Sequence, residues 1–125
     1  LKKVLSPADI ESMREVMYMV YMEEKLKDYI LHLINSTRHP ERYPRLNDLK
    51  GLIEFGASPR ATIYLARAAK ANAYISGRAY VIPDDIKAIA RDVLRHRIIL
   101  SYEAEAEEIT TEDIINRILD EIEVP

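Results

Sequence analysis

The chain has 125 residues, of which 48% are hydrophobic and 31% charged, and this length and composition suit one compact domain with its own core. A formal net charge of −3 and the absence of cysteine argue against a dedicated nucleic-acid binder, a disulfide-stapled scaffold and a zinc knuckle. With only three glycines, neither of the common phosphate-binding loops, G-x-x-x-x-G-K-[ST] and G-x-G-x-x-G, can be written, so we do not expect a self-contained nucleotide enzyme.

Two helices are predicted in the first third of the chain. Ser6 suits an N-cap and Pro7 the first helical position, and the helix that follows carries an apolar face expected in the core: Ile10, Met13, Val16, Met17 and Val20. The second helix is expected to end near Arg38, because His39 precedes a proline, and its core positions are Leu26, Tyr29, Ile30, Leu33 and Ile34. Between residues 40 and 57 we expect at most a short helical turn, around Leu46–Phe55.

Three more helices are predicted in the rest of the chain. The third runs from Ser58-Pro59 to Gly77, with a buried stripe of Ala61, Tyr64, Leu65, Ala68, Asn72 and Ile75. The fourth starts at Pro83 and is expected to fray there, since Ile82 stands where a Ser or Thr cap belongs; its core face is Ile86, Ile89, Ala90, Val93 and Leu94. The last is capped by Thr110 and Asp113 and buries Ile114, Ile115, Ile118, Leu119 and Ile122.

Apart from an ambiguous apolar run at residues 98–100, no strand pattern stands out. The sequence therefore predicts one all-α domain over residues 1–125, a bundle of about five helices. The longest apolar runs are a few residues, which predicts no membrane span and a cytoplasmic protein.

Several residue types have more than one interpretation. The four methionines, all between residues 13 and 22, could line an adaptable groove but are interpreted as core. The eight tyrosines are interpreted as half-buried residues at the rim of the bundle, with one wet end each. The three histidines lack metal-ligand spacing, so no metal site is predicted.

Charge is unevenly distributed along the chain. Residues 60–100 carry eight basic and three acidic residues, net +5, whereas residues 101–125 carry one basic and nine acidic, net −8. The basic segment 60–97 supports one alternative, a helical nucleic-acid-binding or regulatory adaptor module. Because the acidic segment offsets it and no aromatic platform interleaves it, we expect no specific nucleic-acid binding.

The most informative segment is Gly56–Ala61, which contains Ser58, Pro59 and Arg60 at the predicted start of the third helix. Arg60 falls at about the second helical position, where a cation opposes the helix dipole at a cost of about 0.3–1 kcal/mol. A helix N-terminus with free N–H groups and a guanidinium suits a phosphate, although an exposed arginine that tolerates this penalty is the alternative. Arg67 lies seven residues on, about 20° away around the helix.

At this point the chain resembles the C-terminal lid of MoxR-type AAA+ ATPases. The resemblance covers nearly the whole chain and is carried by motifs in the family's order: Tyr29-Ile30, Thr37-Arg38, Gly56-Ala-Ser-Pro-Arg60-Ala, Ala68-Ala-Lys-Ala71, Gly77-Arg78, Tyr80-Val-Ile-Pro-Asp-Asp-Ile86, Val93-Leu-Arg-His-Arg97, Thr110-Thr-Glu-Asp-Ile-Ile115 and Val124-Pro125. Arg67 and the methionine-rich first helix are not part of the family pattern.

The resemblance implies a nucleotide-sensing role. Arg60 resembles the sensor 2 arginine, which reaches from the lid to the γ-phosphate of ATP, and Ser58 and Gly56 are implied as further cofactor-binding residues. The catalytic parts and Mg²⁺-bound ATP would belong to an α/β domain upstream, so no ATP hydrolysis is expected from these residues alone. The family further implies a chaperone-like, bacterial, homo-oligomeric ring, expected to be a hexamer, with a von Willebrand factor A-domain protein as partner.

Overall fold

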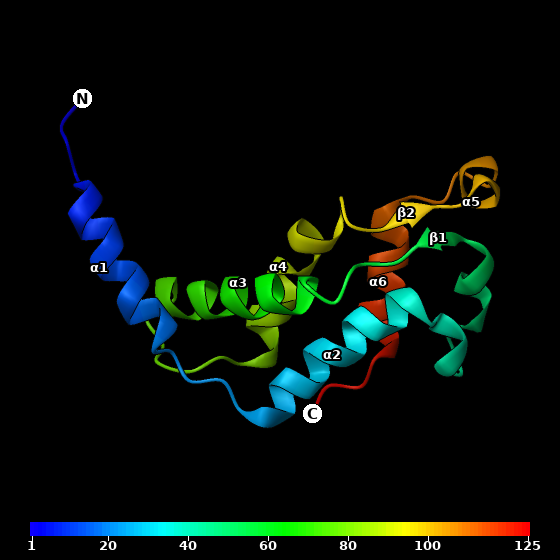
Figure 1. The fold of residues 1–125 in the computed structure, drawn as a ribbon, viewed down its shortest axis with the longest axis horizontal. Helices are drawn as coiled ribbons and strands as arrows, with labels where there is room; N and C mark the ends of the chain where they lie inside the picture. The colour runs from blue at the N-terminus through cyan, green and yellow to red at the C-terminus, as the bar shows by residue number, and fades with distance from the viewer.

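The computed structural model describes all of residues 1–125 and places them in an elongated helical domain (Figure 1). Its α-helices are α1 (Pro7–Tyr18), α2 (Glu24–Arg38), α3 (Ala61–Ile75), α4 (Pro83–Leu94), α5 (Tyr102–Ala106) and α6 (Thr111–Glu121). Two 3₁₀ turns, η1 (Pro40–Arg42) and η2 (Asn47–Gly51), and two strands, β1 (Ile53–Phe55) and β2 (Ile99–Leu100), complete it. The predicted all-α class is confirmed, with one helix more than the predicted five because a short helix, α5, forms within the acidic segment.

The two strands form a small antiparallel pair with an irregular register. Ile53 faces Leu100 and Phe55 faces Ile99, and the Ser101 N–H continues the ladder by donating to the Leu52 carbonyl at 2.9 Å. The ambiguous apolar run at residues 98–100 is therefore a strand edge, whose partner lies about 45 residues earlier in the chain. The strand pair thus joins the segment that precedes α3 to the segment that follows α4.

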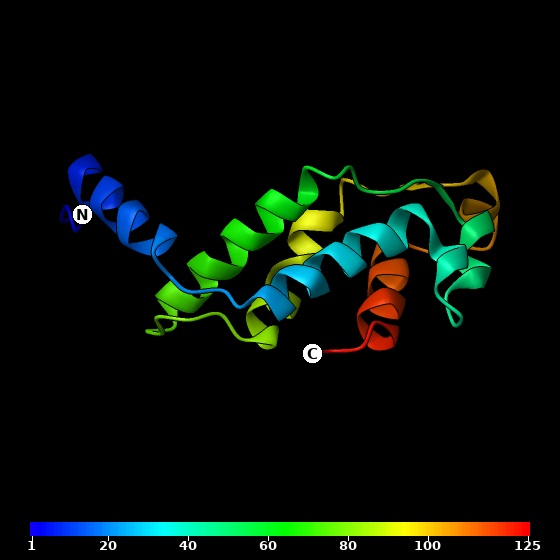
Figure 2. The ribbon, with the colours of Figure 1, turned by 60° about the horizontal axis from the view of Figure 1, so that its bottom comes forward.

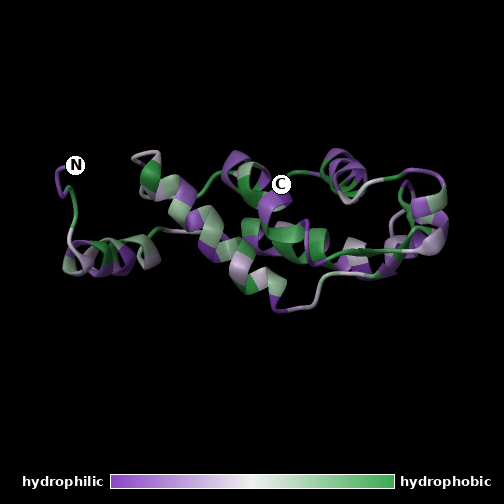
Figure 3. Ribbon diagram, turned by 90° about the horizontal axis from the view of Figure 1, so that it is seen from above, coloured by the Kyte–Doolittle hydropathy of each residue, from purple (hydrophilic) through white to green (hydrophobic).

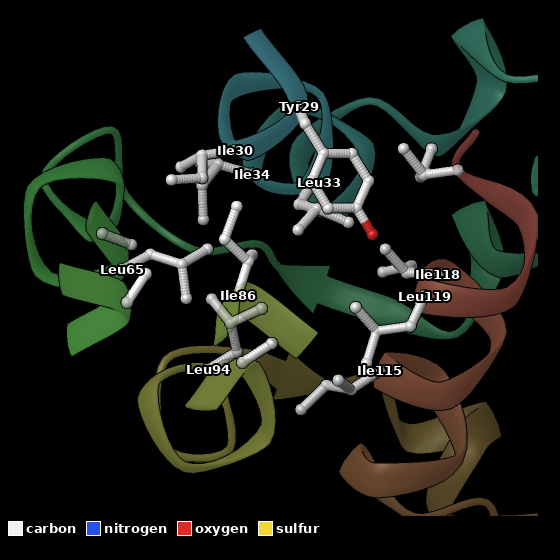
Figure 4. Close-up of a cluster of buried hydrophobic side chains, with 14 of the residues drawn as sticks. Tyr29, Ile30, Leu33, Ile34, Leu65, Ile86, Leu94, Ile115, Ile118 and Leu119 are labelled. Atoms are coloured by element: carbon white, nitrogen blue, oxygen red, sulfur yellow. The ribbon is translucent and has the colours of Figure 1, made fainter. Parts of the chain in front are cut away.

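The core lies where α2, α3, α4 and α6 meet (Figure 4). All five predicted positions of α2 and all five predicted positions at α6 are buried, which confirms the clearest periodic patterns of the sequence. Figure 4 shows the α2 side chains facing Leu65 of α3, Ile86 and Leu94 of α4, and Ile115 and Ile118 of α6. Because these four helices share one core, a change in the packing of one reaches the others.

On α3 the predicted buried stripe is partly wrong. The buried residues recur every four positions, at Ala61, Leu65, Ala69 and Ala73, whereas Tyr64 and Ile75 are 43% and 85% exposed. The small side chains of Ala61, Ala69 and Ala73 allow close packing, and α4 contacts α3 more extensively than any other element does. The larger apolar side chains of α3 therefore stay outside that close contact.

The prediction that α1 packs into the core is wrong. The helix buries none of its residues, and Ile10 and Val16 are almost half exposed. Figures 1 and 2 show α1 leading away from the body, and Figure 3 shows hydrophobic and hydrophilic residues mixed along it. Periodicity reports an apolar face but not what covers it.

The segment after α1 rejoins the body through main-chain hydrogen bonds. Tyr21 N–H donates to the Ala79 carbonyl and Val81 N–H donates to the Tyr21 carbonyl, both at 2.9 Å. Val20 and Met22 are buried here, so the interpretation of the methionines as core holds for Met22, while Met19 is 74% exposed. The attachment of α1 thus combines these residues beyond its end with Tyr18, whose carbonyl accepts a hydrogen bond from Lys70 Nζ of α3 at 3.4 Å.

Tyr29 departs from the predicted rim position of the tyrosines. Its ring is 2% exposed in the core, and its hydroxyl has no hydrogen-bond partner among the described residues. Burial raises the pKa of this phenol. A buried hydroxyl without a partner costs free energy, so its presence does not stabilise the fold.

We expect Tyr29→Phe to leave the free energy of unfolding unchanged or to raise it by up to about 1 kcal/mol, since it removes an unpaired polar atom and keeps the ring. Urea unfolding followed by circular dichroism measures this. Tyr102→Phe, at an 87% exposed position, is the matched control and should change nothing. A loss above 1 kcal/mol in Tyr29→Phe would mean that the hydroxyl is satisfied by an ordered water.

Candidate functional site

The segment that contains Arg60 forms a tight turn between β1 and α3. Ser58 Oγ accepts a hydrogen bond from the Arg60 N–H at 3.1 Å, and the Ser58 carbonyl accepts one from the Ala61 N–H at 2.9 Å. Arg60 has helical dihedral angles (φ −61°, ψ −24°) but immediately precedes α3. The helix was predicted to start at Ser58 and starts instead at Ala61, because the intervening turn closes with i→i+3 bonds.

The expectation of free N–H groups at this helix start is wrong. The N–H groups of residues 60 to 63 all donate within the segment, to Ser58 Oγ, the Ser58 carbonyl, the Pro59 carbonyl and the Arg60 carbonyl. What the segment offers to an anion is the Arg60 guanidinium. This side chain is exposed and forms no hydrogen bond or ion pair with the rest of the chain.

Thr37, in the last turn of α2, holds the beginning of this segment. Its buried hydroxyl accepts a hydrogen bond from the Ala57 N–H at 2.9 Å and donates one to the Ile34 carbonyl at 2.7 Å. Its neighbour Arg38 reaches the Ala57 carbonyl with Nη1 at 3.4 Å. Sequence reasoning did not single out Thr37 as a site residue, and its place in the Thr37-Arg38 motif was the only signal for it.

Gly56 is required by the close approach of this loop to α2. A Cβ atom there would overlap the Thr37 carbonyl and lie 2.8 Å from the Arg38 nitrogen, closer than atoms pack. Gly56 and Ser58 thus both have local structural roles that position Arg60. Their direct contact with a cofactor stays a prediction.

Two other arginines beside this segment also lack a carboxylate partner. Tyr64 lies one helical turn after Arg60, and the Arg97 guanidinium lies 4.9 Å from the centre of its ring. Arg97 also donates a hydrogen bond to the Val93 carbonyl at 2.6 Å. Arg67 lies 5.8 Å from the ring of Tyr18 in α1. Arg67 is therefore directed at α1, although it shares a helix face with Arg60.

The best-formed polar cluster of the domain lies at the opposite end of α3, around Asp85. This carboxylate is 1% exposed and accepts two hydrogen bonds from Arg78, at 2.5 and 2.6 Å, and one each from Asn72 and the Ile82 N–H, both at 2.8 Å. The bond from Ile82 holds the start of α4, so the expectation of a frayed start is wrong. Burial disfavours the charged form, but these hydrogen bonds and Arg78 outweigh it and hold the pKa of Asp85 below 3.8.

The Asp85 cluster is structural, since both of its carboxylate oxygens are already hydrogen-bonded within the chain. No three His, Asp or Glu side chains of the domain are grouped so that they could hold a metal ion. None of its helices has the length and apolar character needed to cross a bilayer. Arg60 differs from the Asp85 cluster in that its side chain is exposed and forms no hydrogen bond or ion pair within the domain.

Comparison with known proteins places the chain among ATPase lids. A family model described as "AAA lid domain" matches residues 48–118. The chain is 40% identical over 124 residues to Chaperone MoxR1 of Mycobacterium tuberculosis and 28% identical over 116 residues to Protein MoxR of Methylorubrum extorquens, and covers 33% of each. The crystal structure of a protein from Cytophaga hutchinsonii, assigned as an ATPase, matches with a TM-score of 0.95 and 44% identity over 99% of this chain and 37% of its own.

Proposed function

This chain belongs to the AAA lid domain family, as the lid of a MoxR-type AAA+ ATPase, and from that premise we propose that Arg60 is its sensor 2 arginine. In this role its guanidinium contacts the γ-phosphate of ATP. The observation that carries the proposal is an exposed arginine without a protein partner, on a loop braced from both sides by hydrogen bonds. A planar guanidinium without a carboxylate partner has no ion pair to break before it meets a phosphate.

The chain spans about a third of the relatives it matches, so the activity of the whole protein is part of the proposal. An upstream α/β domain would bind ATP with Mg²⁺, and the Mg²⁺-bound nucleotide would supply the scissile phosphate. Within this chain, Arg60 would meet the terminal phosphate, while Thr37, Gly56 and Ser58 would hold its backbone. The lid would pass the nucleotide state to neighbouring subunits of a chaperone-like, cytoplasmic ring, expected to be a hexamer, with a von Willebrand factor A-domain partner.

The alternative of a nucleic-acid-binding or regulatory adaptor on residues 60–97 has less support. Two arginines of this segment are neutralised within the domain, Arg78 by Asp85 and Arg95 by Asp92 and Glu112. Glu112 comes from the acidic part of the chain, so the net charges of the two segments partly cancel in the folded domain. The other six cations of the segment form no ion pair within the domain, so this alternative rests on their charge alone.

Nucleotide discrimination tests the sensor role. In the full-length protein, Arg60→Ala should weaken the affinity for a non-hydrolysable ATP analogue about tenfold, which is about 1.4 kcal/mol, because a charge-assisted contact is lost. The affinity for ADP should change less than twofold, since ADP has no γ-phosphate. Isothermal titration calorimetry measures both, and an equal loss for the two nucleotides would refute the sensor role.

A further inference from the structure

We propose that Thr37 is a positioning residue for Arg60, acting from α2 on the loop that carries the guanidinium. The inference rests on the proposed sensor role of Arg60. In this role the buried Thr37 hydroxyl fixes the position of the Arg60 backbone. The long arginine side chain then extends from a defined Cα position. Thr37 itself touches no nucleotide in this scheme.

The hydroxyl of Thr37 is the shorter of two polar links from the end of α2 to Ala57, the other being the bond from Arg38 Nη1 to the Ala57 carbonyl at 3.4 Å. The Thr37 hydroxyl oxygen accepts a hydrogen bond from the Ala57 N–H at 2.9 Å, and its O–H donates one to the Ile34 carbonyl at 2.7 Å, so the hydroxyl joins the loop to the α2 backbone. Thr37 is 1% exposed and Ala57 is fully buried. Water therefore cannot replace the hydroxyl as the partner of the Ala57 N–H without opening the contact.

The Gly56–Arg60 loop, which carries the guanidinium, has little conformational freedom to absorb a displacement of Ala57. Gly56 lies against the α2 backbone with no room for a Cβ, and Pro59 has a fixed φ. The Ser58 side chain and carbonyl bind the N–H groups of Arg60 and Ala61. A shift of Ala57 away from α2 is thus carried over three residues to the Cα atom of Arg60.

Thr37→Val, made in the full-length protein, tests this link because valine has nearly the shape of threonine but no hydroxyl. We expect the affinity for a non-hydrolysable ATP analogue to fall three- to tenfold and the affinity for ADP to stay within twofold. Thr37→Ser keeps the hydroxyl and should retain at least half of the wild-type affinity for the analogue. Thermal unfolding of each variant checks that the protein remains folded.

Ser36→Ala is the matched control. Ser36 is also buried and its hydroxyl makes the same kind of bond, to the Leu33 carbonyl at 2.7 Å, but it does not reach the loop. It should leave the ratio of the two affinities unchanged. If Thr37→Val does not fold, Gly56→Ala displaces the same loop with the hydroxyl intact and should cause the same selective loss.

A double-variant comparison separates failure of this inference from failure of the proposed function. If Thr37 acts through Arg60, Thr37→Val combined with Arg60→Ala should bind the ATP analogue no more weakly than Arg60→Ala alone. Additive losses, or an equal loss for ADP in Thr37→Val, would overturn the positioning role. An Arg60→Ala variant that binds the ATP analogue like wild type would overturn the sensor role itself.

Discussion

Arg60→Ala is expected to lower kcat for ATP hydrolysis by the full-length protein about 10- to 100-fold, because one charged donor to the transferring phosphate is lost. The domain should remain folded, since the side chain is exposed and has no partner in the chain. Removing a cation from the start of α3 relieves an unfavourable interaction with the helix dipole, so the melting temperature should not fall. A coupled assay of phosphate release and a thermal melt measure the two effects.

Two variants serve as controls for the hydrolysis experiment. Arg67→Ala removes a guanidinium from the same helix, but one directed at Tyr18, and its effect on kcat should stay below twofold. Arg60→Lys should recover little activity, because a single ammonium does not reproduce the planar fork of donors. If Arg60→Ala hydrolysed ATP at the wild-type rate, the sensor role would be wrong and Arg60 would be an exposed arginine without a role in hydrolysis.

Asp85→Ala is expected to lower the free energy of unfolding by about 2–4 kcal/mol. Breaking a buried ion pair leaves the remaining charge without its partner, and here Asn72 and the Ile82 N–H lose their acceptor as well. The loss falls below the upper end of the usual range because the Arg78 side chain is 26% exposed and can turn to water. Guanidinium unfolding of the chain measures the change.

Asp84→Ala is the matched control for Asp85. It removes an exposed acid one position earlier in the same helical turn, so it should cost no more than the helix-dipole interaction, about 1 kcal/mol. A comparable loss from both variants would contradict the assigned role of the Asp85 cluster.

The contribution of Asp85 should also depend on pH in a defined direction. Because its pKa is lower in the folded than in the unfolded state, the stabilisation is complete above the ordinary value of 3.8 and declines as pH falls through the lower, folded value. The difference in stability between wild type and Asp85→Asn should therefore be constant from pH 7 to 5 and shrink in strong acid. A difference that grew on acidification would contradict the assignment.

The sequence predicted best where a helix has one buried face and neighbours on that side. In α2 and α6 the apolar residues recur at three and four, and each helix contacts the shared core along that face. The same pattern failed for α1, because the body of the domain lies beside its end and covers its apolar face only in part, leaving Ile10 and Val16 almost half exposed. On α3 the predicted stripe included Ala61 and Leu65, which are buried, but then turned toward Ile75, whereas the buried positions continue through Ala69 and Ala73.

The candidate site was predictable only in part. A helix start near an arginine could be inferred from Ser58-Pro59, and the family motif gave Arg60 its role. The brace from Thr37 could not be inferred, because it joins residues 20 positions apart by a single side-chain bond and leaves no periodic pattern. The sequence likewise does not reveal that Arg78 and Asn72 converge on Asp85.

The way α1 is attached has a consequence for how its sequence can change among relatives. Its end is joined to the α3–α4 loop by main-chain atoms of Tyr21, Ala79 and Val81, and nearly any residue can supply those atoms. Substitutions of the exposed side chains of α1 before Tyr18, which contacts Arg67, therefore leave these hydrogen bonds and the core intact. The exposed side chains of α1 can thus change without disturbing the loop that holds Arg60, which is anchored to α2 by the Thr37 hydroxyl.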